Sequence, residues 1–261
     1  MPSLPFLRRA STLGALALGL AASAAPSLHA QAADRRPTVA VLNFDNAAMV
    51  NNADYEPLSK GMAEMLITTL SGNPGVRVVE RSQLQRLIDE QNLGSSGRVD
   101  KETAVRIGKM VGALHMLKGS FVIDRKQNVR VVAQAVNTET SEIEYAESVS
   151  GKADDLLMLI DQLGAKLNAG LKLPPIPLRV NLPSAPGASA ATATPAVATK
   201  GGANQFRAMM LVSRALEKQD RGDAQGAIAL YKSALQEYPT FDRAKTLLAS
   251  AEGAPGTTRP Q

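Results

Sequence analysis

The chain has 261 residues, of which 44% are hydrophobic and 3% aromatic, and it carries a formal net charge of +5, two histidines and no cysteine. The apolar content is sufficient for a folded core. A chain without cysteine has no disulfide, thiolate nucleophile or Cys-ligated metal centre, and it has no cysteine that could carry a lipid.

Residues 1–32 predict a secretory leader. Arg8 and Arg9 precede an uncharged, mostly apolar run at 13–25, and small residues end the segment at Ala32. The run is shorter than the roughly 20 residues that a membrane-crossing helix needs. We therefore expect cleavage after Ala32, a periplasmic location and no integral membrane span.

The charge of the remaining chain is modest. Removing the two arginines of the leader leaves 27 basic residues against 24 acidic ones. Acidic and basic side chains alternate along the predicted helices, and aromatic side chains that could stack on bases are few. This pattern indicates a mixed-charge surface, and we expect no nucleic-acid partner.

Residues 37–171 predict an α/β domain, because strand and helix patterns alternate along them. A β-branched run at 38–45 is typical of a strand. Apolar residues then recur at helical spacing in three places, which predicts three helices. The first spans 55–70, the second has Ser82 as its expected N-cap, and the third spans 103–111.

Three extended runs follow at 114–123, 129–136 and 143–149, joined by short polar turns. This spacing predicts an antiparallel meander. Residues 153–171 then form an amphipathic pattern with enough apolar surface to lie across the sheet. The expected fold class is α/β, with a mixed sheet that contains an antiparallel meander packed against helices.

The rest of the chain differs sharply in composition. Residues 172–203 are rich in Pro, Ala, Ser and Thr, a composition that favours a disordered linker. Helical patterns return at 204–251, which we expect to form a small α-helical hairpin, and residues 252–261 are expected to be a disordered tail.

Four strings in the α/β region carry a family resemblance. They are VAVLNFDN at 39–46, ERSQLQRLIDEQNL at 80–93, GKMVGALHMLKGSF at 108–121 and VNTETSEI at 136–143. In this order they resemble the CsgG/HfaB family, named after the curli secretion channel, over about 37–171. The resemblance implies a non-enzymatic protein of the cell envelope that acts in curli-like assembly or transport and forms a homo-oligomeric ring.

The chain departs from that family pattern in two respects. It has no cysteine to lipidate. The candidate insertion points for membrane hairpins, 124–128 and 150–152, have five and three residues, whereas a hairpin that crosses a bilayer takes about 20. We therefore expect the domain to lack the transmembrane barrel hairpins.

Residues 208–241 resemble one tetratricopeptide (TPR) repeat. Small residues stand where two helices would cross, at Ala215 and Ala227, Gly222 stands at the turn and Tyr231 at a packing position. The alternative is a plain amphipathic hairpin. Since one repeat does not bury a continuous core, we expect it to dock on the first domain, on another copy or on a partner.

A partner-binding face is assigned by analogy with this repeat. It lies on the inner side of the first helix and comprises Met209, Val212, Leu216 and Gln219. We expect the partners to be proteins of the cell envelope.

The sequence offers no assembled catalytic or metal site, and we expect no enzymatic activity and no cofactor. His115 is the one histidine beyond the leader, and no nucleophile-elbow serine precedes it. The carboxylate groups at Asp154–Asp155 and at Glu139, Glu142 and Glu144 are expected to be solvated charges.

Three functions are therefore considered. The first is a periplasmic assembly or adapter component of a curli-like secretion or envelope-assembly system. The second is a periplasmic activator of an envelope enzyme, a peptidoglycan synthase. The third is a cryptic hydrolase, which would depend on His115.

Overall fold

The computed structural model describes residues 36–47, 52–91, 99–174 and 202–253. All of them belong to one compact unit that runs from Arg36 to Gln261. The predicted leader, most of the predicted linker and nearly all of the predicted tail lie outside the described residues.

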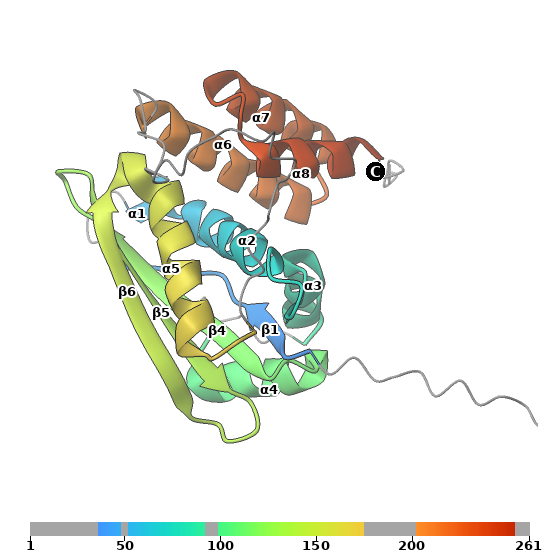
Figure 1. Ribbon diagram of the computed structural model, residues 1–261. Coiled ribbons are helices and arrows are strands. Elements are labelled where there is room, and N and C mark those ends of the chain that lie inside the picture. Colours follow the sequence, from blue (N-terminus) through green and yellow to red (C-terminus); the bar gives the residue numbers. More distant parts are fainter. Residues whose placement is uncertain (1–35, 48–51, 92–98, 175–201, 254–261) are drawn as a thin grey trace, which may run out of the picture. The chain divides into compact units, whose positions relative to one another are not determined.

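The described strands form a mixed sheet in the order β3-β1-β4-β5-β6, with β2 paired to β4. Figure 1 labels β1, β4, β5 and β6, which follow one another across the sheet. Their bounds are β1 Thr38–Val41, β2 Asp45–Asn46, β3 Arg77–Val78, β4 His115–Ile123, β5 Asn128–Asn137 and β6 Ile143–Lys152. Strand β1 is parallel to β3 and β4. Strand β4 is antiparallel to β5, and β5 is antiparallel to β6. The predicted mixed sheet with an antiparallel meander is confirmed.

Helices cover both faces of this sheet. Their bounds are α1 Asn52–Tyr55, α2 Leu58–Ser71, α3 Arg81–Glu90, α4 Lys101–Val111 and α5 Leu156–Gly170, the last preceded by the 3₁₀ turn η1 Ala153–Asp155. Alternation along β1 sets the two faces: Val39 and Val41 pack with α2 and α5, whereas Ala40 and Leu42 pack with α3 and α4.

One helix start differs from the expectation. Helix α3 begins at Arg81 with Glu80 in the N-cap position, and no side chain caps it. The Ser82 hydroxyl donates instead to the Glu80 carboxylate at 2.9 Å. The expected cap at Ser82 is therefore wrong, because Ser82 already lies within the first turn of the helix.

Three helices follow the predicted linker: α6 Gly202–Asp220, α7 Ala224–Glu237 and α8 Asp242–Gly253. Gly222 turns the chain between α6 and α7 with φ 81°, a left-handed conformation that favours glycine. The Asp223 carboxylate then accepts from the Gly226 N–H and caps α7. We call α6–α8 the helical region.

Small residues let α6 and α7 approach closely. Ala215 and Ala227 are fully buried between them, and Tyr231 is fully buried as well. The helical hairpin is therefore present, and its identity as a tetratricopeptide repeat stays a prediction. None of the helices in the described residues has both the length and the hydropathy to cross a membrane.

Candidate protein-interaction site

The structure places the predicted partner-binding residues inside the molecule. Met209, Val212 and Leu216 are at most 1% exposed and share one apolar cluster with Leu58 and Met62 of α2. The remaining candidate, Gln219, accepts a hydrogen bond from the Tyr231 hydroxyl at 2.9 Å. In this conformation the apolar part of the predicted face is covered by the α/β domain.

The covering contact between α2 and α6 is very close. A Cβ atom built on Gly61 would lie 1.9 Å from the Ser213 hydroxyl oxygen and 3.1 Å from the methyl carbon of Met209. Ser213 is fully buried, and its hydroxyl donates to the Met209 carbonyl. Glycine on one helix and serine on the other thus allow the two backbones to approach.

A network of ion pairs crosses the same interface. Arg81 donates to both carboxylate oxygens of Asp220, at 2.8 and 3.0 Å, and Lys60 donates to Asp220 at 2.6 Å. The Arg81 Nε lies 3.3 Å from the Glu64 carboxylate, which also accepts from the Arg243 guanidinium. The network joins α2 and α3 of the α/β domain to α6 and α8.

The charged groups of this network are buried or partly buried, and each is stabilised by its oppositely charged neighbours. The side chains of Arg81 and Glu64 are 4% and 5% exposed. Burial alone would lower the pKa of Arg81, but the hydrogen bond and charge of Asp220, together with Glu64, outweigh it and raise the pKa. Burial would likewise raise the pKa of Asp220, and Arg81 and Lys60 reverse this and lower it.

An aromatic contact adds to the docking. Tyr55 of α1 and Phe206 of α6 meet edge to face, with ring centroids 6.4 Å apart. The sequence left open whether the helical region docks on the first domain, on another copy or on a partner. In the structure it packs against the first domain of its own chain. Sequence patterns missed the ionic network, although Arg81 lies in one of the strings that carry the family resemblance.

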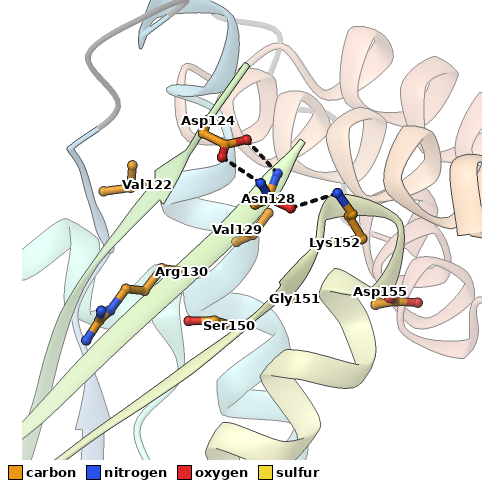
Figure 2. A pocket seen from close by; sticks show the side chains of 9 residues that line it. All are labelled: Val122, Asp124, Asn128, Val129, Arg130, Ser150, Gly151, Lys152 and Asp155. Atoms are coloured by element: carbon orange, nitrogen blue, oxygen red, sulfur yellow. Dashed lines mark hydrogen bonds between the residues drawn. The ribbon is translucent and has the colours of Figure 1, made fainter. Parts of the chain in front are cut away.

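Accessible candidate surfaces lie elsewhere. A hollow of about 720 Å³ lies at the end of the meander, next to the β4–β5 turn. Figure 2 shows the side chains that line it. Val122, Arg130 and Ser150 line it from three adjacent strands, and Val122 is 40% exposed. Among the described residues Arg130 is exposed and has no ion-pair partner.

Polar contacts hold the rim of this hollow in shape. The Asp124 carboxylate accepts from the side chain and backbone of Asn128 and from the Lys126 N–H, and these bonds hold its pKa below the usual range. Lys152 donates to the Asn128 side chain at 2.7 Å. These bonds hold the turn in one conformation.

Two smaller clefts of about 380 Å³ each flank the helical region. One is lined by both apolar and polar side chains, including Met158, Phe241, Asp161 and Arg243, and Met158 is 50% exposed. The other lies between α1, α6 and α7 and includes Arg214 and Arg221. Both are surface clefts whose walls come partly from α6–α8.

His115 is engaged in a contact across the sheet. Its ring Nδ1 contacts the Glu144 carboxylate, which also accepts from the Asn137 side chain. The three residues come from neighbouring strands β4, β5 and β6, and His115 is 7% exposed. Within the ranges that the structure describes, no three His, Cys, Asp or Glu side chains gather where they could hold a metal ion.

The carboxylate groups named from the sequence fall at two separate places. Asp154 and Asp155 lie in η1, directly before α5. Glu139 and Glu142 are exposed in the β5–β6 turn, at the other end of the meander from the hollow. The structure does not bring these two groups together.

Comparison with protein families gives a partial match. The model of the family described as curli production assembly/transport component CsgG matches residues 21–123. The match ends with Ile123, the last residue of β4, so β5, β6 and α5 lie outside it, whereas the sequence resemblance extends over about 37–171. No curated protein matches the chain.

Several solved structures are distantly similar. The LpoB C-terminal domain from Escherichia coli shares 18% identity at a TM-score of 0.33, covering 48% of this chain and 89% of that chain. The PelC dodecamer from Paraburkholderia phytofirmans shares 16% at 0.35, covering 54% and 91%. Lipoprotein GNA1162 from Neisseria meningitidis shares 13% at 0.38, covering 51% and 99%. At this distance they support no inference about a partner or an assembly, and the similarity to the CsgG family rests on residues 21–123.

Proposed function

We propose that this protein is a non-enzymatic, periplasmic adapter of a cell-envelope assembly or secretion system similar to that of the CsgG family. The observation that carries the proposal is the match of the family model to residues 21–123, which span the strands and helices from β1 to β4. The predicted leader at 1–32 supports export to the compartment in which such a system acts.

A binding role agrees with the contacts of His115. A general base needs a proton to abstract within hydrogen-bond reach. His115 instead contacts Glu144, and Asn137 donates to the same carboxylate, so this histidine takes part in a link across three strands. This contact favours a structural role for the residue on which a hydrolase would depend.

The accessible end of the meander is the surface that we assign to a protein partner. It combines exposed Val122 with the guanidinium of Arg130 and the hydroxyl of Ser150. An apolar side chain next to a cation and a neutral hydrogen-bonding group suits a protein segment that carries a carboxylate. The helical region, which we regard as tetratricopeptide-like, then serves as a docked support.

Export is tested with a reporter that folds only where disulfides form. Residues 1–36 are fused to a disulfide-dependent phosphatase, and the matched control carries Leu16→Asp and Leu18→Asp in the apolar run. We expect activity from the native leader and none from the control. A native fusion that stays inactive, with an uncleaved N-terminus, would contradict the periplasmic location.

Partner binding is tested by site-specific photo-crosslinking in the host. A crosslinking residue is placed at exposed Val122 or Met158, or at the buried control position Leu216. We expect adducts with envelope-assembly proteins at the exposed positions and none at Leu216. If neither exposed position yields an envelope protein, the adapter function is wrong.

A further inference from the structure

Strand β6 forms one edge of the described sheet, and half of its backbone points away from the sheet. Ala153 donates its N–H to Gln127 of the β4–β5 turn, in register with the pairing of Gly151 and Val129. In an antiparallel pair, the N–H and C=O groups of successive residues point alternately toward the paired strand and away from it. Those of residues 147, 149 and 151 therefore point toward β5. The N–H and C=O groups of Ala146, Ser148, Ser150 and Lys152 therefore point outward.

The unpaired edge of β6 is long. Strand β6 has 10 residues, whereas β3 at the opposite edge has two. Unpaired N–H and C=O groups in a row form a template for a further strand, and natural proteins block such edges. In the described part of the chain no strand pairs with the outer side of β6.

One side chain occupies the place that a further strand would need. The Glu147 carboxylate accepts from the outward N–H of Ser148 at 2.9 Å. The Tyr145 hydroxyl donates to the same carboxylate at 3.0 Å, and Lys166 of α5 donates to it at 3.2 Å. These three donors fix the carboxylate against the edge, where a pairing strand would have to bring a carbonyl oxygen.

The charge state of Glu147 agrees with this geometry. Its pKa is lowered, first by the Ser148 N–H and then by Tyr145 and Lys166. The carboxylate therefore stays charged across the neutral range. A charged group at an edge has to be desolvated before another strand can pair there, which opposes pairing.

The sequence of β6 is self-complementary around Ser148. In an antiparallel pair of two copies centred on this residue, Glu144 of each copy lies opposite Lys152 of the other. Ala146 lies opposite Ser150, and Ser148 lies opposite itself. Opposite charges at both ends and small side chains between them fit a second copy of this strand, while Glu147 stands in the way.

We propose that Glu147 is an edge guard: it caps the Ser148 N–H and thereby keeps β6 from pairing with β6 of a second copy of this chain. Removing the guard exposes an edge that associates antiparallel about Ser148. This inference does not depend on the adapter function, although Ser150 of β6 also lines the hollow, because it is argued from the outer edge of β6 and the contacts of Glu147.

The test is the mass in solution of residues 33–261, measured by light scattering over a range of concentrations at neutral pH. Glu147→Ala removes the guard. Glu139→Ala is the matched control, since Glu139 is an exposed glutamate of the β5–β6 turn, away from the outer edge of β6. We expect a concentration-dependent rise of about two-fold relative to native protein for Glu147→Ala, as for a two-fold dimer, and no rise for the control.

A rescue variant tests the mechanism. Glu147→Ala combined with Ser148→Pro lacks the outward N–H that a second strand would use, and the β5–β6 ladder does not need this donor. The double variant is expected to return to the native mass. If Glu147→Ala keeps the native mass at every concentration, or if the double variant associates as strongly as Glu147→Ala, the proposal is overturned.

The register is tested by crosslinking, for which the cysteine-free chain is a clean background. Ser148→Cys, added to Glu147→Ala, would face its own copy at a Cα separation of about 5.5 Å, within disulfide range. Ser150→Cys in the same background would face Ala146 instead and should not crosslink. Association of the Ser148→Cys variant without a disulfide between the two copies would reveal another contact and contradict the proposal.

Discussion

Gly61 of α2 and Ser213 of α6 meet in the interface between the helical region and the α/β domain. A Cβ on Gly61 would come within 1.9 Å of the Ser213 hydroxyl oxygen and 3.0 Å of the Ser213 Cβ. Rotating the hydroxyl away would break its bond to the Met209 carbonyl and would not relieve the second contact. Glycine at this position is therefore required by the docking of α6.

Gly61→Ala is predicted to destabilise the protein. In a free helix the change would stabilise by about 0.5–1 kcal/mol, but overpacking at a closed contact costs about 1–3 kcal/mol. An approach of 1.9 Å to the Ser213 hydroxyl oxygen places the cost at the upper end of this range, so we expect a net loss of about 2 kcal/mol in the free energy of unfolding by urea. Gly253→Ala at the end of α8, where a Cβ meets nothing within 4 Å, is the control and should lose nothing.

Arg81→Leu is predicted to be more damaging. It leaves the buried Glu64 and the partly buried Asp220 with fewer counter-charges, and breaking a buried ion pair costs about 3 kcal/mol. The urea midpoint should fall accordingly. Arg86→Leu, on the same helix but exposed and without an ion-pair partner in the described residues, should leave the midpoint nearly unchanged. Equal effects of the two substitutions would show that the network contributes little.

The stability of the protein should depend on the charge of Asp220 at acid pH. Its pKa is lowered in the folded protein by Arg81 and Lys60, against the effect of burial. The resulting stabilisation is fully present above the pKa of an unfolded aspartate, about 3.9, and is lost as the pH falls through the lower pKa of the folded state.

Asp220→Asn removes this titration. In urea unfolding at a series of pH values from neutral to strongly acid, the variant should start less stable and lose less as the pH falls. The remaining carboxyl groups titrate in both proteins and serve as the common background. Parallel pH profiles for the two proteins would contradict the role assigned to Asp220.

The meander could be predicted closely from the sequence. The runs at 114–123, 129–136 and 143–149 became β4, β5 and β6 with ends shifted by at most three residues. Alternating side chains and polar turns such as the one at Asp124 are local signals, and they act over only a few residues. Helix ends were less certain, as Ser82 shows.

The docking of the helical region could not be predicted in the same way. The spacing of Met209, Val212 and Leu216 shows that one face of α6 is apolar, but periodicity does not say what covers it. Gly61 and Arg81 supply the other side of the contact from more than 100 residues away in the sequence. The residues expected to bind a partner pack against the α/β domain in this structure, since an internal interface and a partner-binding face produce the same pattern, and their binding role stays a prediction.

The most direct test of this account asks whether α6–α8 remain attached when the chain between the two parts is cut. A protease site is inserted into the Pro-rich segment near residue 190 of the 33–261 protein, and the cleaved product is analysed by size-exclusion chromatography. The buried interface around Gly61, Ser213 and the Arg81–Asp220 pair predicts that both fragments elute together, and that Arg81→Leu with Gly61→Leu releases them. Separation of the fragments in the native background would contradict the docked arrangement and would leave Met209, Val212 and Leu216 available to a partner.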